Sequence, residues 1–206
     1  MKHLLAAAAL GFAALAPWSA HGAPAVVGQP APAFTATDLS GKPVSLAEFK
    51  GKTVVLEWVN PGCPYVRKHY DSANMQGTQR EAAAKGVVWL ALNSTAQDHS
   101  DYKAPAAMAA WMSSQKAAAS ATLMDADGKV GRAYGARTTP HMYIIDPRGT
   151  LVYAGAIDNK PTANPADVAT AINHVKVALA ESLAGKPVSV AQTRAYGCSV
   201  KYASGA

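Results

Sequence analysis

Two largely apolar runs constrain the fold of this chain more than any other feature of its sequence. They cover residues 53–59 (Thr-Val-Val-Leu-Glu-Trp-Val) and 87–92 (Val-Val-Trp-Leu-Ala-Leu). Runs of this kind are typical of strands that are buried on both faces of a parallel sheet. The segment 64–85 between them has room for a helix that ends at Gly86. The sequence therefore predicts a strand, a helix and a parallel strand joined by a right-handed crossover.

The remaining segments extend this pattern into a mixed sheet. Further strands are expected at 34–37, 43–45, 122–124, 142–145 and 150–154, and a further helix at 105–116. The quartet 146–149 (Asp-Pro-Arg-Gly) has the residues of a type I turn, so the last two strands form an antiparallel hairpin. We therefore predict an α/β domain with three layers, in which helices cover both faces of a mixed central sheet.

The clearest helix signal lies near the C-terminal end. Asn164 suits the N-cap and Pro165 the first helical position, and Gly185 ends the segment. Apolar residues recur at steps of three and four between these signals, at Val168, Ile172, Val175, Leu179 and Leu183. This spacing predicts one continuous helix with a single packing stripe, followed by a tail from about residue 186.

The N-terminal segment resembles a secretory signal peptide. Lys2 and His3 precede the apolar run 4–15, and small residues follow at 20–23. We expect cleavage after Gly22, which leaves residues 23–206 as one exported domain, periplasmic in a cell with an outer membrane and otherwise extracellular. The alternative is an N-terminal buried helix. Outside the cytoplasm disulfides persist, which bears on the two cysteines of the chain.

Charge and hydrophobicity exclude two classes of partner. The formal net charge is +6, but the cations are scattered and Arg67-Lys68 is their one adjacent pair. Nucleic-acid binding needs a clustered basic stripe, so we expect no nucleic-acid partner. No apolar run reaches the roughly 18 residues of a membrane-spanning helix, so we expect no membrane span.

Cys63 is the strongest candidate for chemistry. It follows the strand 53–59 and precedes Pro64, which suits the first position of a helix and makes Cys63 its N-cap. A sulfur there faces unpaired N–H groups and the positive end of the helix dipole, which favour the reactive thiolate. The basic residues 67–69 either add positive potential or form a solvated face. The alternative for Cys63 is an inert buried thiol.

At these residues the sequence resembles a known family. The motifs are Cys63-Pro64, the later stretch 138–141 (Thr-Thr-Pro-His), and the lead-in segments 31–34 (Ala-Pro-Ala-Phe) and 41–46 (Gly-Lys-Pro-Val-Ser-Leu). They are similar to those of the thioredoxin-like redoxins, which include the alkyl-hydroperoxide-reductase and thiol-specific-antioxidant proteins. The resemblance runs from about residue 28 to 157 and implies a thioredoxin-like fold.

The resemblance also implies roles for two residues of the second motif. In thioredoxin-like folds the matching Thr-Pro pair holds a cis proline beside the active cysteine. Thr139 and Pro140 would then face Cys63, and their loop would position the backbone of the substrate. The alternative is that Pro140 is only a strand-edge residue.

The chain departs from both active-site patterns of this group. The second cysteine of a thioredoxin motif is replaced by Val66. The Pro and Thr or Ser that accompany a peroxide-attacking cysteine are replaced by Leu56 and Asn60. The chain therefore resembles a peroxiredoxin-like branch that keeps only the first cysteine of the thioredoxin motif, and the peroxidase activity does not carry over residue by residue.

Cys198 is the other thiol, and three interpretations of it are open. A two-cysteine exported chain favours one intramolecular disulfide, here Cys63–Cys198. Cys198 is then either the resolving partner of Cys63 or half of a permanent staple, which would stabilise the fold by about 5 kcal/mol. Two unpaired thiols are the third alternative.

Other candidate groups are weaker. His69 and His141 could join Cys63 in a soft metal site, but no second cysteine accompanies them, so we expect neither a metal nor another cofactor. The segment 125–128 (Asp-Ala-Asp-Gly) lacks the Glu of a calcium loop and is interpreted as a turn. Glu57 is either a buried proton relay to Cys63 or a residue at a solvated strand end.

These observations favour an exported thiol-disulfide oxidoreductase in which Cys63 is the nucleophile. Its partners would be a protein or small-molecule thiol or disulfide and an unidentified reductant. A thiol-dependent peroxidase is the second enzymatic interpretation. The third is a non-catalytic module that presents the groove at Pro140 to an extended peptide.

Overall fold

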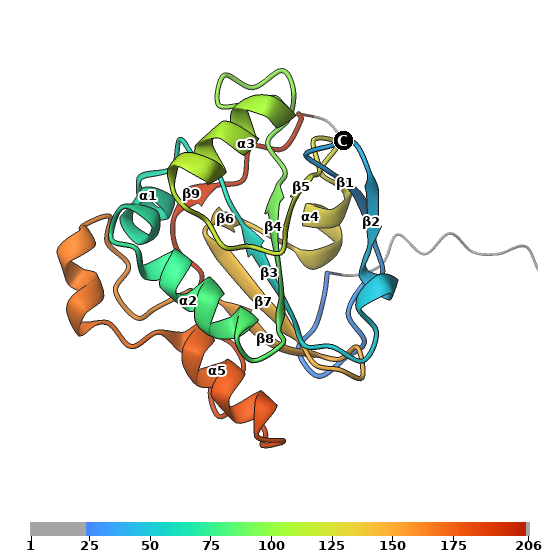
Figure 1. Cartoon of the computed structure of the whole chain (residues 1–206), viewed down its shortest axis with the longest axis vertical. Coiled ribbons are helices and arrows are strands. Elements are labelled where there is room, and N and C mark those ends of the chain that lie inside the picture. Colours follow the sequence, from blue (N-terminus) through green and yellow to red (C-terminus); the bar gives the residue numbers. More distant parts are fainter. Residues whose placement is uncertain (1–23, 205–206) are drawn as a thin grey trace, which may run out of the picture.

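Seven strands form one mixed sheet at the centre of the structure, a computed structural model that describes residues 24–204 (Figure 1). In order across the sheet they are β2 (Pro43–Ser45), β1 (Thr35–Asp38), β5 (Ala121–Met124), β4 (Val88–Asn93), β3 (Val54–Trp58), β7 (His141–Ile145) and β8 (Leu151–Gly155). β4 is parallel to both β3 and β5, whereas β3–β7 and β7–β8 are antiparallel. The predicted parallel unit and hairpin are confirmed.

Within residues 24–204, five α-helices cover the sheet. They are α1 (Pro64–Asp71), α2 (Asn74–Ala83), α3 (Pro105–Ser114), α4 (Lys129–Tyr134) and α5 (His174–Leu183), with two short 3₁₀ helices at Leu46–Phe49 (η1) and Pro165–Thr170 (η2). One core contains side chains of α1, α2, α3 and α5, and a second core contains those of α4. The predicted three-layer α/β fold is confirmed.

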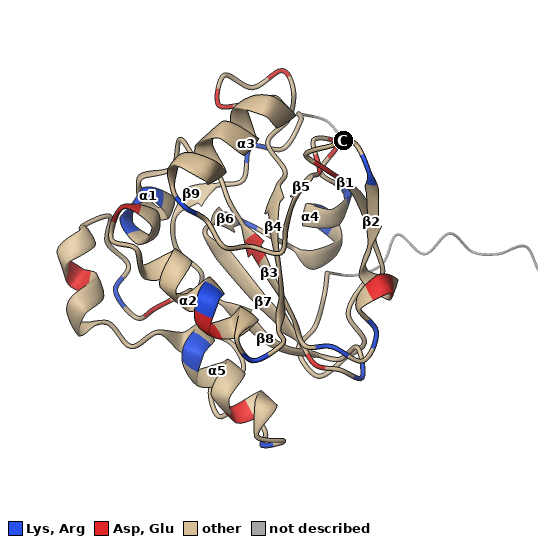
Figure 2. Cartoon of the chain, in the orientation of Figure 1, with Lys and Arg blue, Asp and Glu red and all other residues tan. Residues whose placement is uncertain are grey.

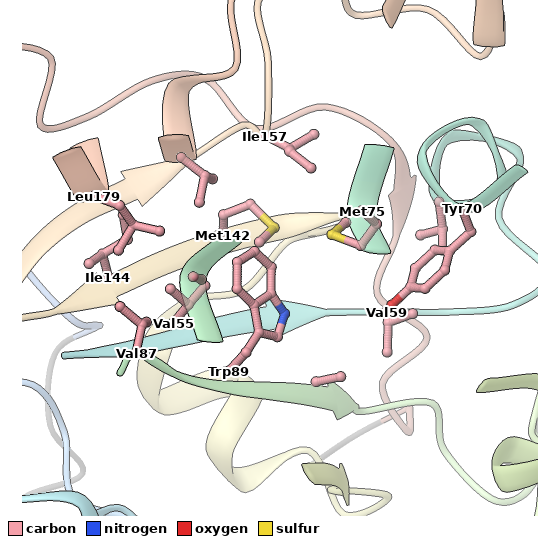
Figure 3. Close-up of a cluster of buried hydrophobic side chains, with 14 of the residues drawn as sticks. Val55, Val59, Tyr70, Met75, Val87, Trp89, Met142, Ile144, Ile157 and Leu179 are labelled. Carbon is pink, nitrogen blue, oxygen red and sulfur yellow. The ribbon is translucent and has the colours of Figure 1, made fainter. Parts of the chain in front are cut away.

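The position of β3 between the two cores explains why its sequence does not alternate between apolar and polar residues. Its pleat directs Val55 into the first core and Leu56 and Trp58 into the second, and all three side chains are fully buried. Figure 3 shows the first core, where Val55 packs among Trp89 of β4 and Met142 of β7. Each such side chain stabilises the fold by about 1.5–3 kcal/mol, so an apolar run here indicates a strand between two layers.

The single helix expected over 64–85 is interrupted. α1 ends before Ser72, and Ala73 adopts a left-handed conformation with φ of 58°. The side-chain amide of Gln76 donates at 2.9 Å to the Tyr70 carbonyl, which also accepts from the Ala73 N–H at 3.0 Å. The break is therefore stabilised by a side-chain contact that no period in the sequence reveals.

The helix expected from Asn164 to 183 is also two elements. Asn164 does cap, accepting from the Ala166 N–H at 3.1 Å, but it starts only η2. Asn173 is a second N-cap and starts α5. The predicted stripe is consequently divided, because Val175 and Leu179 are buried while Ile172 is 57% exposed.

The segment expected as a turn at 125–128 continues into a helix. The Asp125 carboxylate accepts from the backbone N–H groups of Val130 and Gly131, at 3.0 and 2.8 Å. These bonds fix the first turn of α4, a short helix that the sequence analysis missed.

The C-terminal tail is ordered against the domain. It pairs with Ala154 at the edge of β8 and then forms β9 (Cys198–Ser199), which is antiparallel to β6 (Thr138–Thr139). The register places Thr139 opposite Cys198. The expected signal peptide lies outside the described residues.

Basic and acidic residues are scattered over the visible elements (Figure 2). Among residues 24–204, no helix combines the length and hydrophobicity that crossing a bilayer requires.

Candidate active site: two thiols beside a cis-proline loop

The Cys63 side chain is placed by the turn between β3 and α1. The Asn60 side chain accepts from the Gly62 N–H at 2.8 Å, and the Asn60 carbonyl accepts from the Cys63 N–H at 3.0 Å. Pro64 then occupies the first position of α1, which makes Cys63 its N-cap residue as expected. The Cys63 side chain is buried, with 2% of its surface exposed.

The Cys63 sulfur does not bond to the N–H groups of α1. It donates instead to the Thr139 carbonyl oxygen at 3.0 Å. The basic residues that follow are not a common solvated face either. Arg67 is exposed and pairs with Asp71, whereas Lys68 is buried. The N-cap position was predicted correctly, but the sulfur points to the loop across from the helix.

That loop contains the second pair of predicted residues. The Thr139–Pro140 peptide bond is cis, and Thr139 is the last residue of β6. The Thr139 hydroxyl is buried without a hydrogen-bond partner among the described residues. A buried hydroxyl without a partner is unusual and marks this loop as a place where a ligand atom can bind.

Cys198 lies directly across from this loop. β9 pairs Cys198 with Thr139, and the Cys198 side chain contacts the core cluster that contains Cys63. Burial raises the pKa of the Cys198 thiol to about 12, and the hydrogen bond and charge of Cys63 act in the same direction. Both cysteines are free thiols. The fold thus brings together all four residues that the sequence analysis singled out.

Gly197 allows this close approach of the tail. Its φ is 134°, and a Cβ on it would lie 2.1 Å from the Thr139 carbonyl oxygen. No other residue type fits there without moving β9 away from β6. Sequence reasoning missed Gly197, although a glycine next to a candidate cysteine is the signal that could have found it.

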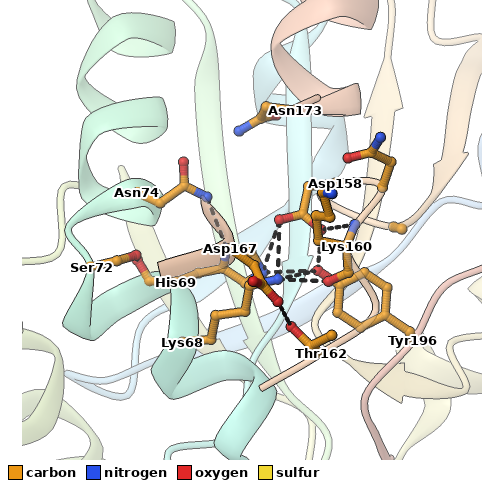
Figure 4. Close-up of polar contacts among 12 residues, drawn as sticks. Lys68, His69, Ser72, Asn74, Asp158, Lys160, Thr162, Asp167, Asn173 and Tyr196 are labelled. Atoms are coloured by element: carbon orange, nitrogen blue, oxygen red, sulfur yellow. Dashed lines mark hydrogen bonds and ion pairs between the residues drawn. The ribbon is translucent and has the colours of Figure 1, made fainter. Parts of the chain in front are cut away.

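A buried polar cluster holds the tail on one side of Cys198 (Figure 4). The Lys68 ammonium lies 3.3 Å from the Asp158 carboxylate and donates to the Lys160 carbonyl at 2.6 Å. The Tyr196 hydroxyl donates to the same Asp158 carboxylate and lies 3.1 Å from His69 Nε2. These contacts link α1 to the tail two residues before Cys198.

A second set of contacts holds the tail on the other side. The Tyr202 hydroxyl donates to the Ala136 carbonyl at 2.8 Å, and the Arg132 guanidinium lies 4.5 Å from the centre of its ring. The Lys201 carbonyl accepts from the Ala96 N–H at 2.8 Å. We call residues 196–202 the strap, because they cross the site and are anchored at both ends.

The two histidines belong to separate networks. Burial lowers the pKa of His69 to about 4, although Asp158 acts in the opposite direction, and burial lowers the pKa of His141 to about 4 as well. His141 Nδ1 contacts the Tyr143 hydroxyl at 3.2 Å. Within residues 24–204, no group of three or more His, Cys, Asp or Glu side chains is arranged to hold a metal ion.

Glu57 lies in the first core and is fully buried, so it is not at a solvated strand end. Its hydrogen-bond partners do not include Cys63. Its carboxylate accepts from the Tyr70 hydroxyl at 2.8 Å, from Gln79 at 3.0 Å and from the Trp89 indole at 2.7 Å. Burial raises the pKa of Glu57 to about 7 despite these three donors. The solvated interpretation was wrong.

Replacement of Glu57 tests this carboxyl group through the pH dependence of stability. Because the folded chain keeps the Glu57 proton to a higher pH than the unfolded chain does, the free energy of unfolding falls between pH 4.5 and about 7. Glu57→Gln should therefore gain roughly 3 kcal/mol relative to the wild type over this window. Urea titrations at several pH values measure the difference.

The contributions of His69 and His141 run in the opposite direction, but they are present in both chains and cancel. Glu81→Gln is a matched control, because Glu81 is exposed and pairs with Lys176 at the surface. Parallel pH profiles for the wild type and Glu57→Gln would contradict the assignment.

Comparisons with known proteins agree with the predicted fold and family. The model of the AhpC/TSA family matches residues 27–154, more than half of the chain. The thiol-disulfide oxidoreductase ResA of Bacillus thuringiensis subsp. konkukian is 26% identical over 133 residues, which are 61% of this chain and 67% of the relative. The strap lies beyond the matched family region.

Two solved structures are similar as well. An uncharacterized conserved protein from Geobacillus kaustophilus has a TM-score of 0.75 and 27% identity, over 90% of this chain and 100% of that one. A protein assigned as the thiol:disulfide interchange protein DsbE from Chlorobium tepidum has a TM-score of 0.51 and 25% identity, over 63% and 84%. The chain therefore belongs to the AhpC/TSA family, a family of thioredoxin-like redoxins with oxidoreductase activity.

Proposed function

We propose that the chain is an exported thiol-disulfide oxidoreductase in which Cys63 is the nucleophile and Cys198 its resolving partner. The observation that carries the proposal is that two free thiols meet at Thr139: the Cys63 sulfur donates to the Thr139 carbonyl, and β9 pairs Cys198 with the same residue. The names of the ResA and DsbE relatives support thiol-disulfide exchange. Residues 23–206 would be the exported domain.

The reaction uses two exchange steps. The Cys63 thiol loses its proton to water, and the thiolate attacks one sulfur of a substrate disulfide and expels the other as a thiolate. Cys63 reacts from the N-cap position of α1, where the backbone N–H groups of the first turn carry partial positive charge. Cys198 then attacks Cys63, releases the second substrate thiolate and leaves a Cys63–Cys198 disulfide for a reductant.

Thr139 and Pro140 position the reacting groups in this scheme. The Thr139 carbonyl orients the Cys63 sulfur, and the partnerless Thr139 hydroxyl is available to donate to a substrate atom. Peroxidase activity is disfavoured, because Leu56 and Asn60 occupy the positions of the peroxide-binding residues and Leu56 is buried in the second core.

A redox titration tests the cycle. The chain is equilibrated in buffers of graded potential, alkylated and weighed by mass spectrometry. We expect the two thiols to disappear together, as one disulfide, with a midpoint above about −300 mV. A midpoint well below that value would indicate a permanent staple, and thiols that never pair would leave a peptide-binding module. Added hydrogen peroxide should be consumed no faster than by a control without the protein.

A further inference from the structure

The arrangement of the strap indicates which sulfur meets the redox partner. Resting on the proposed Cys63–Cys198 cycle, we propose that the external thiol which reduces this disulfide attacks Cys198 rather than Cys63. The partner would then form its mixed disulfide with the tail cysteine. This reverses the order that the position of Cys63 at a helix start suggests.

Cys198 is more accessible from solvent than Cys63. Cys63 is 2% exposed, whereas the Cys198 side chain is only partly buried. β9 also pairs with β6, so the backbone of Thr138 and Thr139 is already hydrogen-bonded to the strap. An extended peptide cannot add to that edge while β9 is in place. A nucleophile from solvent therefore reaches the Cys198 sulfur first.

The strap does not open easily, because it is anchored on both sides of Cys198. Tyr196 is held by Asp158 and His69 on one side of Cys198, and Tyr202 is held by Ala136 and Arg132 on the other. Opening would expose the buried Lys68–Asp158 pair, whose side chains are 0% and 1% exposed. The strap is thus anchored over Cys63 at both ends, and it must open before Cys63 reacts with a group from solvent.

The two possible attacks also differ in the thiolate that they displace. A disulfide is cleaved faster when the displaced thiolate is the more stable one. Attack on Cys198 displaces the Cys63 thiolate, which forms at the N-terminus of α1. Attack on Cys63 would displace the Cys198 thiolate, and burial raises the pKa of Cys198. Access and leaving-group stability favour the same sulfur.

Reduction of the Cys63–Cys198 disulfide takes two exchange steps. A partner thiolate bonds to the Cys198 sulfur, the Cys63–Cys198 bond breaks, and Cys63 leaves with the electron pair as a thiolate. A second partner thiolate attacks the partner's own sulfur in the mixed disulfide, and Cys198 leaves and takes a proton from water. Two thiols are oxidised to one disulfide, and the protein disulfide is reduced by two electrons. The partner class is a small thiol or a protruding cysteine, not an extended segment.

Trapping with reduced glutathione tests the proposal on the full chain. The oxidised wild type is mixed with a small excess of glutathione, quenched early with N-ethylmaleimide and mapped by peptide mass spectrometry. We expect glutathione on Cys198 and the alkyl group on Cys63 in the same molecule. Glutathione on Cys63 with alkylated Cys198 would overturn the inference. A starting sample that forms no Cys63–Cys198 disulfide would instead refute the proposed function, so the two failures are distinguishable.

Two glycine variants test the role of the strap. Gly197→Ala places a Cβ 2.1 Å from the Thr139 carbonyl oxygen, so β9 must leave β6. We expect alkylation of Cys63 in the reduced chain to accelerate at least about tenfold, because the local opening is then built in. Gly185→Ala is the control, since Gly185 also has a positive φ but nothing within 4 Å. Unchanged Cys63 labelling in Gly197→Ala would show that the strap is not the barrier.

Discussion

Cys63→Ser is expected to reduce disulfide turnover to the uncatalysed rate, a loss of at least about 100-fold. Serine keeps the hydrogen bond to the Thr139 carbonyl, which the Cys63 sulfur makes at 3.0 Å, but its hydroxyl cannot form or leave a disulfide. The free energy of unfolding should change by about 1 kcal/mol or less, because shape and donor are preserved. A steady-state assay with a low-molecular-weight disulfide and a dithiol regenerating system measures the loss.

Cys198→Ser provides the matched comparison. It removes a thiol from the same site, but it leaves Cys63 able to react once. We expect a single equivalent of mixed disulfide on Cys63, formed slowly because the strap still covers the sulfur, and no further turnover. Undiminished multiple turnover in Cys63→Ser would remove Cys63 from the mechanism and with it the proposed function.

Asp158→Ala should destabilise the chain by about 3–5 kcal/mol. The substitution leaves the Lys68 ammonium buried, with the Lys160 carbonyl and the Tyr196 hydroxyl as its remaining partners. A buried charge without a counter-ion costs far more than the pair contributes when intact. Chemical denaturation measures the effect, and faster alkylation of Cys63 should accompany it because Tyr196 loses its acceptor.

Two controls separate charge burial from lost packing. Glu81→Ala breaks the Lys176–Glu81 pair, whose side chains are 40% and 57% exposed, and should cost less than about 1 kcal/mol. The double variant Lys68→Met/Asp158→Leu removes both buried charges and should be considerably more stable than Asp158→Ala alone. A double variant no more stable than Asp158→Ala would show that packing, not the stranded charge, causes the loss.

The central strands and the Cys63 turn could be predicted because their causes are local. The run 53–59 and the Cys63-Pro64 step lie on neighbouring residues, where strand composition and helix-start chemistry act directly. The two divided helices could not be predicted in the same way. At these breaks Gln76 donates to the Gln115 carbonyl and the His174 N–H donates to the Ile157 carbonyl, and both are tertiary contacts.

The site divides along the same line. Cysteine chemistry, the Thr139-Pro140 motif and the absence of a second cysteine at Val66 are properties of the sequence itself. The sequence also named Glu57 as notable, but its surroundings decide its state. Tyr70, Gln79 and Trp89 come from three different elements and meet only in the folded core.

By itself the sequence determined the layered α/β class, the position of Cys63 at a helix start and the two thiols available for exchange. Only the tertiary structure decided that Cys198 lies beside Cys63, that the Cys63 sulfur faces the Thr139 carbonyl and that the strap covers it. The physical reason is the sequence separation over which the interactions act. Propensity and capping act within a few residues, whereas the strap is placed by long-range contacts such as that of Tyr196 with Asp158.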